Sequence, residues 1–558
     1  MTTHYICKYT PVELLAALGG NCAVLDQMPD GFPLSDQLGH PNLCGFGKAV
    51  LEACLSGQVK ELVLVNCCDV IRSVYDILEE HGKLDFLFLM DLLHCGDQCA
   101  RQRMKGELLR LAEAYGAYKG AAFDPQVFRS AFVPMEQPSQ PYLSVLGGRV
   151  GDKLFQTMAE SLPLPVRNDT CVHNRSVAQP PEKGDFDALM DWYAGALLEQ
   201  TPCMRMTDAA GRRQLVNDPH LKGVVYHTVK FCDYYGFEYS KLRHELSVPM
   251  LKLESDYTAG SSGQLSTRLE AFAETMAPAQ PSQRKGERNM SSGRYYVGID
   301  SGSTSTDVAI LDRDKNLVAG VILPTGAGAS AGAERALEQA LTQAGLRRED
   351  IAATVTTGYG RTAIQQGDKS ITEITCHAKG AYFLDPSVRT IIDIGGQDSK
   401  VIRLDGEGNV VNFLMNDKCA AGTGRFLELM ACTLELSMEE MSQIGLEWKE
   451  EIVISSMCTV FAESEVVSLI AQNKSRGDII HGLNQSVAAR TAALCRRLGG
   501  EPNYMMTGGV SKNRGVVEAI QRELGVELLV SDRAQLNGAL GVPFLHAAYG
   551  FGHIDRPV

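Results

Sequence analysis

Three glycine-rich turns in the C-terminal half of the chain constrain its fold most, because each follows a short apolar segment that favours a β-strand. The turns span residues 300–307, 393–398 and 506–510. Glycine and small hydroxyl residues let backbone N–H groups approach a phosphate closely. A single turn of this kind is usually ordinary turn chemistry, so only the set of three indicates a phosphate-binding domain.

In order and spacing, the three turns resemble the phosphate-1, phosphate-2 and adenosine motifs of one ATPase superfamily, which contains actin, the sugar kinases and the heat-shock chaperones. The resemblance implies an α/β domain that binds ATP. Asp300 could hold a hydrated Mg²⁺ against the charge of the phosphates. Residues 296–310 and 390–402 form a weak internal repeat, because both have the pattern strand, glycine turn, strand.

Two cysteines lie between the second and third turns. Cys419 and Cys458 each precede a predicted helix, so a thiolate there would face the positive end of a helix dipole. Two cysteines cannot fill the four ligand places of a cubane cluster, but two copies of the chain in a symmetric dimer could. Because free cysteine is a common core residue, the spacing alone leaves open that both are structural thiols.

Residues 295–549 as a whole resemble the activator ATPase (activase) of 2-hydroxyacyl-CoA dehydratases, including the segments 357–361 and 537–541. The resemblance implies that Cys419 and Cys458 bind one [4Fe-4S] cluster between two subunits, and that ATP hydrolysis drives an electron to an acceptor of very low potential. It also implies catalytic roles and a nucleotide site for the following residues: Asp300, Asp393 and Gln397 in catalysis; Ser301, Gly302, Ser303, Thr304, Gly395, Gly396, Gly508 and Gly509 around the nucleotide. A sugar kinase would have no role for the two cysteines.

Sixteen cysteines in 558 residues are unusual for a chain whose start lacks the basic and apolar regions of an export signal. A cytoplasmic location is therefore expected, and there thiols indicate metal or redox chemistry rather than disulfides. The net charge of −14 argues against nucleic acid or an anionic membrane as a partner. No segment approaches the roughly 20 apolar residues of a membrane span.

The N-terminal half alternates predicted strands and amphipathic helices, with strands expected at 61–65, 84–90, 224–228 and 249–253 and a long loop at 161–184. Several cysteines follow these strands, and the carboxyl ends of parallel strands meet at one crevice. Six are candidate cluster ligands: Cys44, Cys67, Cys68, Cys95, Cys99 and Cys232. A zinc site is the alternative, although these cysteines are too dispersed for paired knuckles. Four are left as incidental and one as undecided: Cys7, Cys22, Cys54 and Cys171, and Cys203.

This half more loosely resembles a subunit of the 2-hydroxyacyl-CoA dehydratases, through residues 9–15, the Cys44 segment, 66–69, 230–233, 253–256 and 263–272. In the dehydratases three cysteines hold one [4Fe-4S] cluster, and Cys44, one of Cys67 and Cys68, and Cys232 match them. Two departures stand out: the domain is short and lacks a second dehydratase-type subunit, and the chain has additional thiols. Six thiols favour the related double-cubane cluster proteins, in which six cysteines hold two cubanes bridged by a sulfide.

The expected organisation is an α/β domain with open parallel sheets at 1–276, a linker at 277–294, and an actin-like ATPase domain at 295–558. The expected function is ATP-driven electron transfer in a homodimer, from reduced ferredoxin or flavodoxin through the shared [4Fe-4S] cluster to a second cluster, which reduces a small molecule. That second cluster is a double cubane ([8Fe-9S]) or a single [4Fe-4S]. One alternative is a 2-hydroxyacyl-CoA dehydratase component with its own activator. Another is a non-enzymatic sensor or storage domain fused to an activase.

Overall fold

The computed structural model describes residues 1–134, 138–259, 262–276, 294–326, 328–364, 367–416, 420–454 and 458–548. The chain forms two compact units, Met1–Ala273 (unit 1) and Glu274–Val558 (unit 2). Residues 277–293 of the predicted linker lie outside the described residues. In the described part of the chain, no helix is long and apolar enough to cross a membrane.

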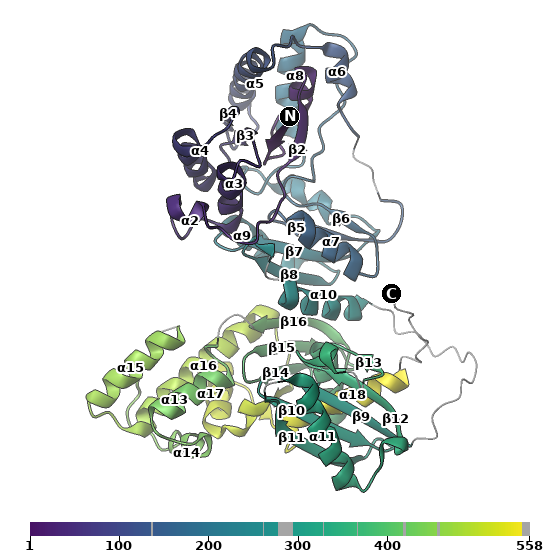
Figure 1. Ribbon diagram of the computed structural model, residues 1–558, viewed down its shortest axis with the longest axis vertical. Coiled ribbons are helices and arrows are strands. Elements are labelled where there is room, and N and C mark those ends of the chain that lie inside the picture. Colours follow the sequence, from purple (N-terminus) through teal and green to yellow (C-terminus); the bar gives the residue numbers. More distant parts are fainter. Residues whose placement is uncertain are drawn as a thin grey trace, which may run out of the picture. The chain divides into compact units, whose positions relative to one another are not determined.

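The first sheet of unit 1 is parallel throughout and has the strand order β2-β1-β3-β4 (Figure 1). Its strands are β1 (Thr2–Tyr5), β2 (Asn21–Val24), β3 (Glu61–Val65) and β4 (Phe86–Met90). Strand β3 is buried along its whole length, which is typical of a central strand in a parallel sheet covered on both faces. The accompanying helices are α1 (Val12–Ala17), α2 (Ser35–Leu38), α3 (Gly45–Leu55), α4 (Asp69–His81), α5 (Gln98–Lys119), α6 (Pro125–Ser130) and α8 (Phe186–Glu199).

The second sheet of unit 1 is also parallel, with the order β6-β5-β7-β8. Its strands are β5 (Tyr142–Gly147), β6 (Val166–Asn168), β7 (Leu221–Val229) and β8 (Met250–Ser255), and its helices are α7 (Asp152–Ser161), α9 (Asp233–Glu245) and α10 (Ser262–Met276). Strand β6 corrects the expectation of a continuous loop at 161–184. It is an edge strand fixed by pairing with β5, and its local composition gives no sign of that partner.

Both sheets of unit 1 have a topological switch point. In the first sheet the chain runs from β1 to β2 on one side and then to β3 on the other, and in the second sheet it runs from β5 to β6 and then to β7. Ligands of open parallel sheets bind beyond the carboxyl ends of the strands at such a point. The gaps between β1 and β3 and between β5 and β7 are therefore the places in unit 1 where a site is expected.

Unit 2 contains two five-stranded mixed sheets with the same arrangement, β11-β10-β9-β12-β13 and β16-β15-β14-β17-β18. The first consists of β9 (Tyr295–Ser301), β10 (Ser305–Leu311), β11 (Leu317–Pro324), β12 (Ile351–Thr357) and β13 (Lys369–Ser370). The second consists of β14 (Thr390–Ile394), β15 (Ser399–Leu404), β16 (Val410–Asn416), β17 (Tyr504–Thr507) and β18 (Leu528–Leu529). In each, a leading antiparallel pair is followed by parallel strands, so the predicted internal repeat is confirmed.

Helices α11 (Ala329–Ala344), α12 (Glu373–Leu384) and α18 (Asn537–Ala548) accompany the first sheet of unit 2. Helices α13 (Gly424–Thr433), α14 (Met438–Ile444), α15 (Thr459–Ala471), α16 (Arg476–Leu498) and α17 (Arg514–Leu524) form a layer beside the second sheet (Figure 1). The predicted fold classes are confirmed: open parallel α/β sheets in unit 1, and in unit 2 the two similar mixed sheets of an actin-like fold.

Candidate functional site

The three glycine-rich turns of unit 2 line one pocket between its two sheets, with a volume of about 350 Å³. Pockets for small molecules commonly measure about 300–1,000 Å³, so this one is large enough for a nucleotide to enter. Nine of the residues predicted from sequence line it: Asp300, Gly302, Ser303, Thr304, Asp393, Gly395, Gly396, Gly508 and Gly509. Ser301 and Gln397 are not among the lining residues, because Ser301 is buried at the end of β9 and Gln397 is exposed.

Two glycines in these turns are required by close approach. Gly508 has φ of +82°, and a Cβ there would lie 2.4 Å from the carbonyl oxygen of Ile394. A Cβ on Gly396 would lie 2.1 Å from Oγ1 of Thr304. The turns from β9, β14 and β17 therefore approach one another too closely for a side chain at Gly396 or Gly508.

A buried cluster of charges forms the floor of the pocket. Nζ of Lys400 lies 2.8 Å from Asp398, 3.2 Å from Asp393 and 3.6 Å from Glu373, measured to the nearest carboxylate oxygen. Thr507 donates a hydrogen bond of 2.8 Å to the other carboxylate oxygen of Asp393. The cluster fixes Asp393 from two sides, so its carboxylate has a defined position in the pocket.

His377 lies between the first two motifs. Its ring nitrogens are 3.7 Å from Asp300 and 3.3 Å from Asp393. Burial would raise the pKa of Asp393, but His377 and Lys400 outweigh burial and lower it to about 2. Burial raises the pKa of Asp300, because that carboxylate has less compensating charge. The lining carboxylates outnumber the lining cationic side chains, so the pocket has the electrostatic character of a site for a hydrated cation.

Sequence reasoning missed this charged floor, although two weak signals were present. Glu373 and His377 are one turn apart on α12, which places them on the same face of that helix. Asp398 directly precedes β15 and Lys400 is two residues later within it, a spacing that predicts the same side of an extended chain. Neither pair identifies its partner, because the cluster forms only when α12, β14 and β15 pack together.

Replacing Lys400 with methionine is expected to lower the free energy of unfolding of unit 2 by about 3–5 kcal/mol, because removing one partner leaves buried carboxylates uncompensated. Urea unfolding of the full chain, followed by tyrosine fluorescence and circular dichroism, measures the change. Lys379→Met is the matched control, because Lys379 is partly exposed and donates a hydrogen bond of 2.8 Å to the neutral side chain of Asn409. Equal effects of the two substitutions would contradict a stabilising role for the buried charge cluster.

Cys458 is exposed and occupies the N-cap position of α15, where its sulfur makes no capping hydrogen bond. Helix α15 packs on α13 and α16 through Ala462 and Val466. Four large apolar side chains of the same helix are exposed: Val460, Phe461, Val467 and Ile470. An exposed thiol at a helix N-terminus therefore borders an uncovered apolar face. Cys419 lies outside the described residues.

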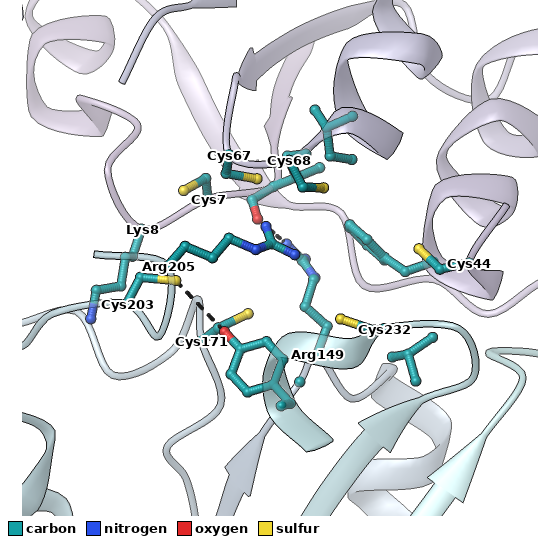
Figure 2. A pocket seen from close by; sticks show the side chains of 16 residues that line it. Cys7, Lys8, Cys44, Cys67, Cys68, Arg149, Cys171, Cys203, Arg205 and Cys232 are labelled. Atoms are coloured by element: carbon teal, nitrogen blue, oxygen red, sulfur yellow. Dashed lines mark hydrogen bonds between the residues drawn. The ribbon is translucent and has the colours of Figure 1, made fainter. Parts of the chain in front are cut away.

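In unit 1, seven cysteines line one cavity of about 70 Å³, shown in Figure 2. They are Cys7, Cys44, Cys67, Cys68, Cys171, Cys203 and Cys232. About 10–15 Å³ would be enough for one water, so the cavity can hold a larger group. Within the described ranges, no three His, Cys, Asp or Glu side chains are placed to hold a single metal ion, so the thiols surround a space rather than a point.

Strand topology explains why these thiols meet. Cys7 follows β1, Cys67 and Cys68 follow β3, Cys171 follows β6 and Cys232 follows β7. The cavity thus lies beyond the switch points of both sheets.

Three of the thiols also begin helices. Cys44, Cys68 and Cys232 are the N-cap residues of α3, α4 and α9, so each faces a partial positive charge. Phe231, directly before Cys232, has φ of +66°, which is rare for an aromatic residue.

Burial raises the pKa of the Cys44 thiol to about 11, although Gly47 donates a backbone hydrogen bond of 3.4 Å to its sulfur. Burial also raises the pKa of the Cys232 thiol. No carboxylate lines the cavity among the residues that the structure describes, whereas Arg149 and Arg205 both do. Cationic walls and sulfur donors suit an anionic, thiolate-ligated group, whose metal would displace the thiol protons.

The cavity differs from the ligand set predicted from sequence. Cys44, Cys67, Cys68 and Cys232 come together, but Cys95 and Cys99 do not line the cavity. Cys95 packs against the core of the first sheet and Cys99 is exposed near the start of α5. Strand β4 is an edge strand, so the segment after it ends away from the switch point between β1 and β3.

Cys7, Cys171 and Cys203, which the sequence left as incidental or undecided, line the cavity instead. The available signal was that Cys7 lies two residues after β1 and Cys171 three residues after β6. It was missed because β1 and β6 are short and β6 lies in the segment expected to be a loop.

Comparison with known families agrees with these two sites. Residues 297–543 match the BadF/BadG/BcrA/BcrD ATPase family. The chain is 51% identical over 247 residues to the activator of lactoyl-CoA dehydratase from Anaerotignum propionicum. The aligned segment makes up 44% of this chain and 95% of the relative. The chain belongs to this ATPase family. The predicted resemblance to the dehydratase activators is thus confirmed, and residues 297–543 form an ATP-binding module of the activator type.

A second member of the family is the (R)-2-hydroxyglutaryl-CoA dehydratase activating ATPase of Acidaminococcus fermentans, 47% identical over 248 residues, 44% of this chain and 95% of the relative. The crystal structure of component A of that dehydratase is 45% identical and covers 45% of this chain and 97% of that one, with a TM-score of 0.44. Residues 7–140 and 134–276 match the 2-hydroxyglutaryl-CoA dehydratase D-component. The activator-type ATPase is therefore fused to a dehydratase-subunit-like region, as the sequence predicts.

Proposed function

We propose that the chain is an ATP-driven electron-transfer enzyme. Cys419 and Cys458 of two copies hold one [4Fe-4S] cluster at a homodimer interface, and ATP hydrolysis drives low-potential electrons to a second iron–sulfur cluster in unit 1, where a small molecule is reduced. The observation that carries the proposal is the ring of seven cysteines around one cavity, in the same chain as an activator-type ATPase. Reduced ferredoxin or flavodoxin is the proposed donor, and the cytoplasm is the proposed location.

The uncovered face of α15 supports the dimer. Val460 and Phe461 lie two and three residues after Cys458 and are 63% and 67% exposed. Apolar side chains so exposed on one face of a helix mark an interaction surface. A second copy of the same face is the proposed occupant, because a two-fold axis beside Cys458 would bring two copies of that thiol together. Sedimentation of the anaerobic protein as a monomer would contradict the shared cluster.

The nucleotide pocket supports ATP hydrolysis through its own side chains. Asp393 is the proposed partner of a hydrated Mg²⁺, because it is buried, ionised and held by Thr507 and Lys400. Asp300 and His377 extend the same polar wall. The backbone turns at Gly395 and Gly508 are the proposed phosphate cradle. Gln397, proposed from sequence as catalytic, is exposed outside the pocket lining and would act only if the turn that carries it moves.

The chemistry of the donor set supports a cluster in unit 1. The proposed ligands come from the cysteines that line the cavity, so Cys7, Cys171 and Cys203 join Cys44, Cys67, Cys68 and Cys232 as candidates, and Cys95 and Cys99 become weaker ones. Seven thiols exceed the four that one cubane uses, which favours a double cubane over a single one. A bound cluster would supply one-electron redox chemistry at this position.

We propose residues 1–276 and 295–558 as the two domains and residues 277–294 as a tether between them. A tether of this length raises the effective concentration of each domain for the other.

The match of residues 7–276 to a dehydratase component favours one alternative, in which the chain dehydrates a 2-hydroxyacyl-CoA thioester with its own activator.

Iron per chain in anaerobically purified protein tests the proposal. A double cubane plus half of a shared cubane gives about ten irons per chain, whereas a single cubane in unit 1 gives about six. A value near six would overturn the double cubane and favour the dehydratase alternative. A value near two would leave unit 1 without a cluster and would overturn the proposal itself.

Serine substitutions of individual cysteines locate the ligands. Cys67→Ser and Cys232→Ser are expected to lower the iron content of unit 1 by about four irons or more, because each removes a thiolate from the cavity. Cys99→Ser is the matched control, since Cys99 is an exposed thiol of the same unit, and it is expected to leave the iron content unchanged. Iron loss from Cys99→Ser equal to that from Cys67→Ser would show that the cavity is not the site.

A further inference from the structure

Arg205 is a cation inside the cysteine cavity without a carboxylate partner. It lines the cavity, and in the described part of the chain no ion pair joins it to an Asp or Glu. Its Nε is buried without a hydrogen-bond partner among the described residues. The groups that interact with its charge include the thiols of Cys67, Cys68 and Cys203 and the phenol of Tyr235, and the Cys232 thiol also interacts with its side chain. A buried guanidinium needs a compensating anion, so something in the cavity must supply negative charge.

The other two cations of the cavity have polar partners of different kinds. Arg149 forms a buried ion pair with Asp26 and donates to the backbone carbonyl groups of Ile6 and Leu25. Lys8 donates a hydrogen bond of 2.7 Å to Oδ1 of Asn174. The charge of Arg149 is thus compensated by Asp26, and burial lowers the pKa of Lys8 to about 8, so Lys8 can lose its charge. Arg205 differs from both, because a guanidinium stays protonated and no carboxylate partner compensates it among the described residues.

We propose that Arg205 is a positioning residue that donates to the anionic iron–sulfur cluster of unit 1 and raises its reduction potential. This inference rests on the proposed function, because it assigns a residue to the cluster that the proposed function places in the cavity. Figure 2 shows the Arg205 side chain extending among the sulfur atoms of the cavity. Its guanidinium carbon lies 4.9 Å from the ring centroid of Tyr234, which restrains the guanidinium plane.

The positive charge of Arg205 determines the direction in which the reduction potential changes. Reduction adds one electron to a group that already carries negative charge, so a fixed cation nearby stabilises the reduced state more than the oxidised state. The guanidinium is always protonated and offers several N–H donors in one plane, so it provides both charge and hydrogen bonds to sulfur. Removing the charge should make the cluster harder to reduce while leaving the thiol ligands in place.

The test uses the full chain carrying Cys458→Ala, which simplifies the spectrum to the cluster of unit 1, and compares Arg205→Gln, Arg205→Lys and Arg103→Gln. Arg103 is an exposed arginine of α5 and serves as the control. Iron content and an EPR-monitored redox titration are measured on each variant. For Arg205→Gln we expect the ratio of reduced to oxidised cluster at a fixed potential to fall at least tenfold, which is a shift of 59 mV for one electron. Arg205→Lys, which keeps the charge, should fall between wild type and Arg205→Gln, and Arg103→Gln should match wild type.

If Arg205→Gln keeps its full iron content and its midpoint potential is unchanged, the role of Arg205 at the cluster is overturned. The guanidinium would then compensate the charge of an anionic substrate instead. If Arg205→Gln does not fold, Arg205→Lys decides, because lysine keeps the charge but has fewer donors. A ratio of reduced to oxidised cluster that falls less than tenfold supports a charge effect, and a ratio that falls tenfold or more overturns it. Absence of any cluster from unit 1 in the Cys458→Ala parent chain is a separate result. It would overturn the proposed function itself rather than the assignment of Arg205.

Discussion

Replacing Cys458 with alanine is expected to remove about two irons per chain and to abolish ATP-driven reduction of unit 1, while nucleotide binding remains. Two of the four ligands of a shared cubane would be lost, because each copy of the chain contributes one Cys458. The nucleotide pocket should survive, since Cys458 is exposed at the start of α15 and does not line that pocket. Iron quantification, EPR and nucleotide titration measure the three effects.

Cys432 provides the matched control for Cys458. It is an exposed thiol at the end of α13 in the same unit, so Cys432→Ala removes a comparable surface sulfur. The control should retain full iron content and full ATP-driven electron transfer. Electron transfer that persists in Cys458→Ala would contradict the shared cluster, whatever its effect on iron content.

Replacing Asp393 with asparagine is expected to lower kcat for ATP hydrolysis by about 10²-fold or more, because the ionised carboxylate is lost at the proposed position of the metal. The pKa of Asp393 is held at about 2, so the wild-type group is charged throughout the neutral range. Asparagine has the same shape and can still accept the hydrogen bond from Thr507. The loss should therefore be in turnover rather than in folding.

The surrounding charges explain why Asp393→Asn should fold when Lys400→Met is destabilised. Lys400 retains Asp398 at 2.8 Å and Glu373 at 3.6 Å after the substitution, so no buried charge becomes unpaired. Asp314→Asn, in the exposed turn between β10 and β11, is the control and should hydrolyse ATP at the wild-type rate. A wild-type rate in Asp393→Asn at saturating Mg²⁺ and ATP would rule out the proposed role of Asp393.

Local sequence was sufficient to predict the features that depend on neighbouring residues. The turns at Gly302, Gly395 and Gly508 were predictable because a glycine turn after an apolar strand is a local signal. Cys67 and Cys232 were predictable for the same reason, since each follows a long apolar strand whose carboxyl end could be located.

The features missed from sequence depend on which strands become neighbours. Cys95 follows β4 by five residues and Cys67 follows β3 by two, but β4 is an edge strand and its carboxyl end does not reach the switch point. Cys171 follows β6, a strand of three residues that is defined only by its pairing with β5. Lys400 forms ion pairs with Glu373 on α12 and Asp393 on β14, and no local sequence pattern predicts that these residues lie close together.

The most direct test of the central claim is an EPR experiment on the dimeric protein, partly reduced with dithionite under anaerobic conditions and then mixed with MgATP or with a non-hydrolysable analogue. The account predicts that MgATP lowers the signal assigned to the Cys419 and Cys458 cluster and raises a reduced signal that depends on Cys67 and Cys232. The analogue should give at most a single transfer. ATP hydrolysis at the normal rate with both signals unchanged would contradict ATP-driven electron transfer between the two sites.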